Sequence, residues 1–339
     1  MKPIFKCELE YSYFPHLNQI YDGFIKLSEK GVIDLSIKRN CVGSSPLLKV
    51  LVNEKHTVIF DTADGLNWIS DSREENLKFF KNNFKVDFYF KRSLNQLVID
   101  NSPSNCKVFP LGLNYFITPE KYLGANLKRK IKFFFKKNIK KHNFYSKDFE
   151  FYPVVHKKNK ILFLTRLWNP DDVSLDSLKE ERERINKNRI EFIKSCKSEF
   201  KNNFIGGIQY DDFSKKNSKD LLMPSSMTNK RNFMQTVKES NICIATKGLH
   251  DSIGWKFAEY VTASRAIISE PLSYELPGDF SINKNYSEFK TKDDLMINIS
   301  DLLENKNKMV KMMNNNYNYY NNYLESDKLV LNALLKIYE

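Results

Sequence analysis

The sequence predicts an α/β protein made of two Rossmann-like domains, and three observations lead to that prediction. At 339 residues the chain is longer than a single hydrophobic core usually grows. In each half, short apolar segments with the composition of strands alternate with segments of helical periodicity. The alternation restarts at Ile161, after an irregular polar stretch. We therefore expect two doubly wound sheets, each with helices packed against it.

The first domain is expected to span residues 1–150. Its predicted strands are 3–10, 32–37, 47–52, 56–61, 86–90 and 107–111. Between the first two strands, Leu17, Ile20, Phe24 and Leu27 recur at helical spacing and predict a helix over 16–30. The fourth strand runs into Asp61-Thr62-Ala63-Asp64-Gly65, which is typical of the carboxyl edge of a parallel sheet, where open α/β folds bind ligands.

The second domain is expected over residues 161–310, after a linker at 151–160 that contains Pro153. Its predicted strands are 161–164, 203–210, 241–246 and 265–269, and its predicted helices are 175–200, 229–239 and 255–263. From residue 292 onward the sequence is helical. We expect residues 311–339 to form C-terminal helices that cross back to the first domain.

Charge and hydropathy restrict the class of protein. A mean hydropathy of −0.51, no apolar run of about 20 residues and no signal-peptide pattern predict a cytoplasmic protein without a membrane-spanning helix. The five cysteines are spread singly, which indicates reduced core residues rather than disulfide or zinc sites. The net charge of +13 favours anionic partners, among them nucleotide diphosphates, membrane surfaces and nucleic acid.

Residues 239–271 contain the groups that bind a nucleotide diphosphate in α/β proteins. Gly248 and Gly254 would allow close backbone approach at the start of a helix. Lys256, in the first turn of that helix, would pair with phosphates, and Glu259, one turn later on the same polar face, would hold ribose hydroxyls. The alternative is that Lys256 and Glu259 form a solvated ion pair without a ligand.

This stretch resembles the donor-binding region of GT-B glycosyltransferases, with Gly254, Lys256, Glu259, Ala263 and the strand Ala266-Ile267-Ile268-Ser269 in the corresponding positions. Residues 161–167 resemble the strand that opens the donor domain in that superfamily. Thr165-Arg166 stands in place of the usual Gly-Arg pair, and Arg166 in the position of a diphosphate-binding arginine. Many retaining members have a second glutamate upstream, whose place Asp251 or His250 would take here.

The whole chain is similar to bacterial surface-polysaccharide glycosyltransferases of the capsule and lipopolysaccharide type. The similarity rests on Phe60-Asp61-Thr62-Ala63-Asp64, Tyr89-Phe90-Lys91-Arg92-Ser93 and Phe109-Pro110-Leu111-Gly112-Leu113-Asn114-Tyr115. It implies two domains facing across a cleft, the first on the acceptor side. It also implies transfer of a hexose or related sugar from a nucleotide-sugar donor to a glycan or lipid-linked glycan acceptor.

The candidate catalytic residues on the acceptor side are Asp61 and Asp64, since a carboxylate can orient or deprotonate the acceptor hydroxyl. Both are alternatively turn formers. His16 and His250 are the histidines to test. No Asp-x-Asp triplet in the donor half is typical of a metal site, with Asp211-Asp212 the one pair left to consider, so neither a metal nor another cofactor is expected.

Residues 122–141 form a basic segment with an apolar helical stripe and three phenylalanines at 133–135. Its cations are Lys128, Arg129, Lys130, Lys132, Lys136, Lys137, Lys140 and Lys141. Such a helix can lie on an anionic membrane, here the inner face of the cell membrane, grip a nucleic-acid backbone, or pack as a solvated surface helix. The sequence leaves these alternatives open.

Two other classes of function compete with sugar transfer. A non-enzymatic α/β protein could use its positive charge to bind nucleic acid, but the basic residues are spread over both halves and no nucleic-acid motif occurs, so we expect no nucleic-acid partner. A nucleotide-dependent epimerase or dehydrogenase would need a G-x-G-x-x-G turn after a first strand, and neither half contains one.

Overall fold

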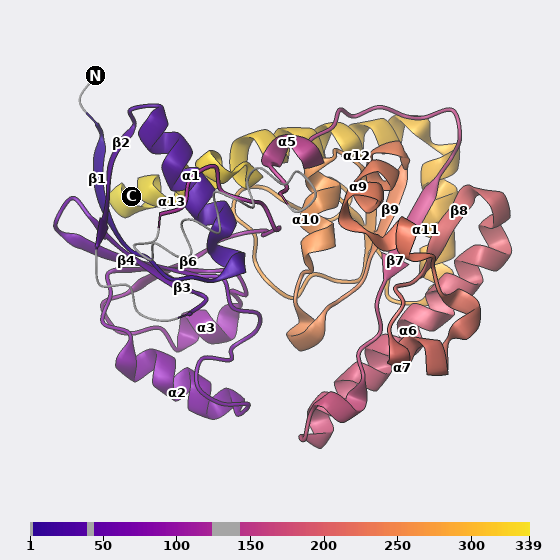
Figure 1. The fold of residues 1–339 in the computed structure, drawn as a ribbon, viewed down its shortest axis with the longest axis horizontal. Helices are drawn as coiled ribbons and strands as arrows, with labels where there is room; N and C mark the ends of the chain where they lie inside the picture. The colour runs from indigo at the N-terminus through magenta and orange to yellow at the C-terminus, as the bar shows by residue number, and fades with distance from the viewer. Residues whose placement is uncertain (1–2, 39–43, 124–142) are drawn as a thin grey trace. The chain divides into compact units, whose positions relative to one another are not determined.

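The computed structural model describes residues 3–38, 44–123 and 143–339. Its contacts divide the chain into two compact units, each with a sheet and packed helices (Figure 1). Unit 1 comprises Met1–Phe149, Ser273–Asp279 and Asn321–Glu339, and unit 2 comprises Glu150–Leu272 and Phe280–Tyr320. The predicted α/β class is confirmed for both units.

Unit 1 contains a six-stranded sheet in the order β2-β1-β3-β4-β5-β6. The strands are β1 (Phe5–Glu10), β2 (Ile33–Lys38), β3 (Leu47–Val52), β4 (His56–Asp61), β5 (Phe88–Lys91) and β6 (Lys107–Pro110). β3 runs antiparallel to both neighbours, and the other adjacent pairs are parallel. Asn53 and Glu54 turn the chain straight back with φ of 52° and 57°, whereas a parallel β3 and β4 would need a crossover of about a dozen residues. The sheet is therefore mixed.

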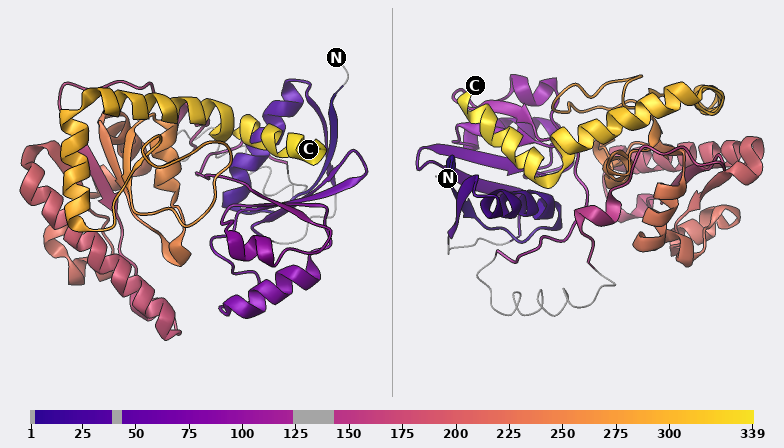
Figure 2. Two further views of the ribbon diagram at one scale, coloured as in Figure 1. Left: turned by 180° about the vertical axis from the view of Figure 1, so that it is seen from behind. Right: turned by 90° about the horizontal axis from the view of Figure 1, so that it is seen from above.

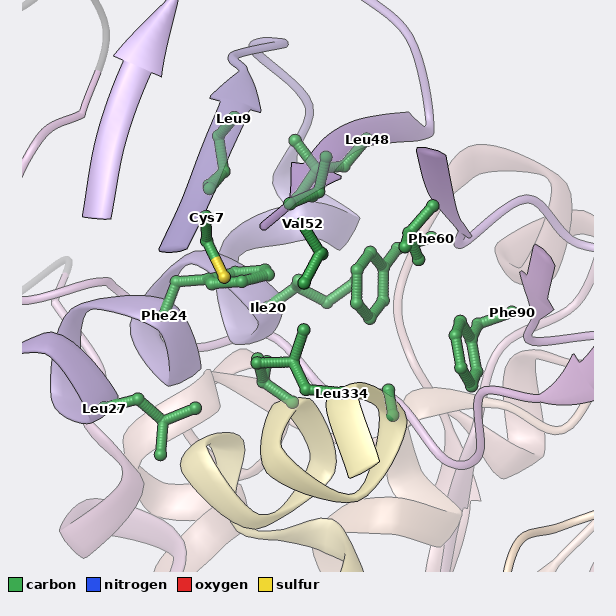
Figure 3. Packing of buried hydrophobic residues seen from close by; sticks show 14 of the residues in the cluster. Cys7, Leu9, Ile20, Phe24, Leu27, Leu48, Val52, Phe60, Phe90 and Leu334 are labelled. Carbon is green, nitrogen blue, oxygen red and sulfur yellow. The ribbon is translucent and has the colours of Figure 1, made fainter. Parts of the chain in front are cut away.

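Helices pack against both faces of this sheet. The helices among the described residues of unit 1 are α1 (Asn18–Glu29), α2 (Arg73–Asn83), α3 (Gln96–Asp100), α5 (Ser146–Phe149) and α13 (Ser326–Leu335). On one face, α1 and α13 enclose the main core, where Figure 3 shows Phe24 and Leu334 among the strand side chains, Phe60 included. On the other face, α2 and α3 contribute Phe80 and Val98 to a second cluster. Successive residues of β4 and β5 alternate between the two clusters, as the pleat requires.

Unit 2 contains a five-stranded parallel sheet in the order β11-β10-β9-β7-β8. The strands are β7 (Ile161–Thr165), β8 (Phe204–Ile208), β9 (Ile242–Ala245), β10 (Ala266–Ser269) and β11 (Ser287–Glu288). Counted from β7, this is the doubly wound order 2-1-3-4-5. The chain fills one side of β7 with β8 and the other side with β9, β10 and β11. The switch point of the topology lies between β7 and β9.

The three central strands of unit 2, β7, β9 and β10, are buried at every residue, as a doubly wound sheet requires, whereas the edge strands β8 and β11 are partly exposed. Its helices are α6 (Asp176–Phe200), α7 (Asp212–Asn217), α8 (Ser225–Thr228), α9 (Lys230–Glu239), α10 (Trp255–Thr262), α11 (Lys292–Glu304) and α12 (Lys306–Tyr319). Alternate strand residues pack with α6, α11 and α12 in one core cluster. The residues between them, such as Leu162, Cys243 and Ile267, are also fully buried.

The C-terminal chain leaves α12 in unit 2 and ends in unit 1, where α13 packs closely on α1 (Figure 2). A Cβ added to Gly23 of α1 would come within 2.1 Å of the Ser326 carbonyl oxygen. Ser326 Oγ donates to Asp22 Oδ2 over 2.5 Å, and Gln19 Nε2 donates to the Leu324 carbonyl over 2.8 Å. Residues 321–339 are therefore an integral part of unit 1.

Residues 151–160, predicted as the linker, belong to unit 2. The buried guanidinium of Arg265 donates to the carbonyls of Tyr152 and Val154, and Ser264 Oγ donates to the Phe151 carbonyl over 2.8 Å. The stretch is irregular because its backbone carbonyls accept hydrogen bonds from these side chains and not from the backbone of a neighbouring strand.

The predicted basic segment 122–141 lies mostly outside the described residues, since 124–142 are not among them. In the part of the chain that is described, no helix has the length and apolar character needed to cross a membrane.

Candidate functional site

The switch point of unit 2 brings together the ends of two central strands. Arg166 directly follows β7, and Thr246 and Lys247 directly follow β9. Open α/β sheets bind ligands outside the carboxyl ends of their strands at such a point. The residues around these two strand ends therefore form the candidate site of unit 2.

Arg189 of α6 holds the two strand ends together. Its Nη1 donates to the Arg166 carbonyl over 2.7 Å, its Nη2 to the Lys247 carbonyl over 2.8 Å, and its Nε to Thr246 Oγ1 over 3.1 Å. Burial lowers the pKa of Arg189 to about 10, against the opposing charge of Glu270, so the group is cationic at neutral pH. Its guanidinium thus adds positive charge to the site while fixing both loops.

Arg189 was not among the site residues predicted from the sequence. The residue lies in a helix rich in charged side chains, which is typical of a solvated surface. The sequence does contain one indication that Arg189 is buried, because it shares a helical stripe with apolar residues. The stripe consists of Ile185, Arg189, Phe192 and Cys196, and all four are buried in the structure. An arginine within an apolar stripe indicates a buried cation with assigned partners.

Lys256 lies in the first turn of α10, as predicted, and is partly buried. Its Nζ donates to the Leu164 carbonyl in β7. Burial, joined by the charges of Arg189, Lys230 and Arg166, lowers the pKa of Lys256 to about 7, while the charge of Glu259 opposes the shift. Four cations therefore surround the ends of β7 and β9.

Glu259 does not lie on an exposed polar face, which corrects the prediction. Its side chain is completely buried, because the neighbouring residues of α10 pack into the core. Its Oε1 accepts a hydrogen bond from Lys230 Nζ of α9, whereas its Oε2 has no hydrogen-bond partner among the described residues. A solvated ion pair between Lys256 and Glu259 is therefore not what the structure contains. A buried carboxylate oxygen without a donor is costly, and a ligand hydroxyl would satisfy it.

Gly254 is the N-cap residue of α10, with φ of −68°. A Cβ added there would meet no atom within 4 Å, so packing gives no reason for glycine at this position. The space lies at the N-terminus of an eight-residue helix, where backbone N–H groups and the helix dipole favour an anion.

The loop between β9 and α10 contains three further predicted residues. His250 and Asp251 have φ of 58° and 53°, in the left-handed region. His250 N donates to Glu181 Oε1 of α6 over 2.7 Å, and Gly248 N donates to the Ser252 carbonyl over 2.9 Å. A Cβ on Gly248 would come within 2.6 Å of Ser252 Oγ, so the fold of the loop itself favours glycine there.

In unit 1, Asp61 ends β4 and is completely buried. Its Oδ1 accepts from Ala63 N over 2.8 Å, and its Oδ2 accepts from Trp68 Nε1 over 2.9 Å and Tyr89 Oη over 2.6 Å. Lys91 Nζ, also buried, lies 3.1 Å from that Oδ2 and donates to the Ala63 carbonyl over 3.0 Å. Burial lowers the pKa of Lys91, and the charge of Asp61 opposes the shift. These contacts fix the loop that follows β4.

Asp64 lies in that loop, and 37% of its side chain is exposed. Its Oδ1 accepts from Arg92 Nη1 over 2.7 Å. Nearby, His16 Nδ1 lies 3.4 Å from the Thr62 carbonyl oxygen. Burial and then the charge of Arg92 lower the pKa of His16, while the charge of Asp64 raises it. Asp64 is thus the solvent-accessible carboxylate of the pair, with a cation and an imidazole close to it.

The structure therefore gathers the predicted donor-side residues within unit 2 and the two predicted carboxylates within unit 1. Of the pair Asp211-Asp212, which was considered for a metal, Asp211 accepts a hydrogen bond from Ser214 N over 2.7 Å and caps α7. Across residues 3–38, 44–123 and 143–339, no group of three His, Cys, Asp or Glu side chains is placed to hold a metal ion.

No family model matches the sequence, and no curated protein matches it. Among solved structures, the chain is similar to WaaG, a glycosyltransferase involved in lipopolysaccharide biosynthesis, at 11% identity and a TM-score of 0.41, over 76% of this chain and 64% of that one. It is similar to Anabaena HepE in complex with UDP and glucose at 11% identity and a TM-score of 0.45, over 79% and 68%. It is also similar to UDP-GlcNAc 2-epimerase from Neisseria meningitidis bound to UDP-GlcNAc at 17% identity and a TM-score of 0.39, over 74% and 62%.

Proposed function

We propose that the protein is a glycosyltransferase of the GT-B type that moves a sugar from a nucleotide-sugar donor to a glycan or lipid-linked glycan acceptor without a metal ion. One observation carries the proposal. Three basic side chains, Arg166, Arg189 and Lys230, lie close enough to Lys256 to shift its pKa, at the switch point of a doubly wound sheet, and Lys230 binds one oxygen of the buried Glu259 carboxylate, whose other oxygen lacks a donor. A nucleoside diphosphate offers both the anion and the hydroxyl that this arrangement needs.

The phosphates would lie at the N-terminus of α10. Arg166 and Lys256 would bind their oxygens, and the open space at Gly254 would let them approach the backbone. As the bond from the sugar to the diphosphate breaks, negative charge grows on the leaving oxygen, and these cations would stabilise it without a metal.

The ribose would lie over Glu259, whose Oε2 would accept a hydrogen bond from a ribose hydroxyl. Lys230 neutralises the buried carboxylate from its other oxygen. His250 and Asp251, held in left-handed backbone conformations, would present their side chains to the donor sugar or phosphates.

On the acceptor side, Asp64 would take the proton of the attacking hydroxyl, since it is the accessible carboxylate. Asp61 would act indirectly, by fixing the loop that contains Asp64, because each of its own oxygens already accepts hydrogen bonds from unit 1. In the transfer step, the acceptor oxygen bonds to the sugar carbon and the bond from that carbon to the diphosphate oxygen breaks. The diphosphate leaves with the electron pair, and the proton of the acceptor hydroxyl goes to Asp64.

We further propose that the basic segment 122–141 holds the enzyme on an anionic membrane surface on the cytoplasmic side. Each lysine near such a surface contributes about 1 kcal/mol. Reversing the charge of Lys132, Lys136 and Lys140 should then release the protein from anionic liposomes while leaving transfer to a short soluble acceptor unchanged. Co-sedimentation at two salt concentrations tests this, and equal sedimentation of the two proteins would contradict it.

The proposed function is tested by measuring the melting temperature with UDP, GDP, the corresponding nucleotide sugars, single-stranded DNA and RNA. We expect stabilisation by at least one nucleoside diphosphate and none by nucleic acid. Mass spectrometry of incubations with and without glycan acceptors then identifies the reaction. A glycan extended by one sugar supports transfer, whereas a nucleotide sugar isomerised without an acceptor would establish an epimerase instead.

A further inference from the structure

Arg166 is stacked on an aromatic ring that none of the proposed steps uses. Its guanidinium carbon lies 3.6 Å from the centre of the Trp168 ring, and its side chain is exposed. Among the described residues, no ion pair between Arg166 and a carboxylate is found. Burial lowers the pKa of Arg166, and the charge of Asp211 opposes the shift. The group is thus a cation held by a ring rather than by an anion.

The backbone of Trp168 is held by a side chain of α6. Asn186 of α6 is buried, and its Oδ1 accepts from Trp168 N over 2.9 Å while its Nδ2 donates to the Trp168 carbonyl over 2.6 Å. These two bonds fix the backbone of Trp168 whatever side chain it carries. Arg182 of α6 lies further away, with its guanidinium carbon 6.0 Å from the ring centre.

Stacking restrains a guanidinium in a way that leaves it able to bind. The flat face rests on the ring, and the N–H groups project from the edge of the plane, where they can bind a phosphate with two parallel hydrogen bonds. A free arginine side chain would lose much of its rotational freedom on binding, whereas a stacked one has already lost it. Lysine lacks the flat face and cannot be positioned in this manner.

We propose that Trp168 is a positioning residue that pre-orients Arg166 for the diphosphate of the donor. This inference rests on the proposed function, because it assigns the ring to the binding of the same ligand. It predicts that the ring matters for nucleotide affinity only while Arg166 is present.

A double-mutant cycle tests the inference, with the dissociation constant of UDP, or of the nucleoside diphosphate that binds most tightly, measured by calorimetry. Trp168→Leu should weaken binding by about 5- to 30-fold, the range expected for loss of a cation–π contact. Trp168→Phe keeps an aromatic face and should stay within about threefold of the wild-type protein. In an Arg166→Ala background, Trp168→Leu should cause no further loss.

Melting temperatures of all variants separate positioning from folding, because backbone bonds hold residue 168 in each of them. An equal loss from Trp168→Leu with and without Arg166, or no loss at all, would overturn the inference while leaving the proposed function intact. Failure of the wild-type protein to bind any nucleoside diphosphate would overturn the proposed function and the inference together.

Discussion

At the scale of single residues, the candidate site of unit 2 places basic side chains close together in partly buried positions, which lowers the stability of the fold. The Lys256 ammonium is partly buried near three other basic side chains, while the charge of Glu259, the Leu164 carbonyl and the face of the Phe233 ring favour its protonated form. A ligand that brings negative charge would relieve this repulsion. Removing the ammonium should therefore stabilise the empty protein, as is common for residues kept for function.

Lys256→Met should raise the melting temperature and reduce nucleotide affinity at least about tenfold, the loss expected for one charge-assisted hydrogen bond. The gain in stability should depend on pH. Because the pKa of Lys256 falls from its ordinary value of 10.5 to about 7, the unfolded chain holds one more proton between these values, and wild-type stability rises with pH across that window. The advantage of the variant should thus be largest below pH 7 and shrink toward pH 10. Thermal unfolding of both proteins at pH 6, 8 and 10 measures this, and a constant difference would contradict it.

The two aspartates of unit 1 should respond differently to the same substitution. Asp61→Asn leaves Lys91 buried without its partner, which costs about 3–5 kcal/mol for a broken buried ion pair, so the melting temperature should fall clearly. Asp64→Asn should change it little, because the side chain is 37% exposed, yet should lower turnover by about a hundredfold or more through loss of the base. Donor affinity should be unchanged in Asp64→Asn, and its loss there would contradict the division of roles between the units.

At the scale of elements, most strands could be predicted because their signal is local. β3 and β4 begin and end where the apolar pattern predicts, and every predicted strand of unit 2 is present. The helix α2 was not predicted, since its apolar residues are few, although Ser72 followed three residues later by Glu75 is a capping signal that could have indicated it. The antiparallel direction of β3 depends on pairing across the sheet, but the short gap before β4 was a sufficient clue.

Substituting Gly23 within α1 and Gly254 at the N-cap of α10 should distinguish a residue needed for packing from one needed for ligand binding. Gly23→Ala places a methyl group against the Ser326 carbonyl and should destabilise unit 1 by about 1–3 kcal/mol, the usual cost of overpacking. The methyl group of Gly254→Ala meets no atom within 4 Å, so the variant should lose no more than the roughly 1 kcal/mol by which glycine exceeds alanine as an N-cap, while it weakens nucleoside diphosphate binding. Thermal unfolding and calorimetry of both variants check this. Unchanged affinity of Gly254→Ala for the nucleoside diphosphate would show that the N-terminus of α10 is not part of the binding site.

At the scale of the whole molecule, two α/β units could be predicted from one sequence, but the burial of charged side chains could not. The periodicity of α10 placed Glu259 and Lys256 on one polar face, whereas in the structure Glu259 is buried and bonds to Lys230 of α9. Arg189 was missed for the same reason, since its partners are backbone carbonyls distant in sequence. Long-range contacts of buried charges leave little trace in a local pattern.

The basic side chains and the buried carboxylate of unit 2 are proposed to form the site for a nucleotide-sugar diphosphate. The most direct test is the calorimetric affinity of wild type, Glu259→Gln and Glu199→Gln for the best nucleoside diphosphate, with Glu199 as an exposed control on α6. We predict that Glu259→Gln weakens binding by about 10- to 100-fold, as loss of a charged hydrogen bond requires, while Glu199→Gln matches the wild-type protein. Equal affinity of all three proteins would contradict the assignment of this site.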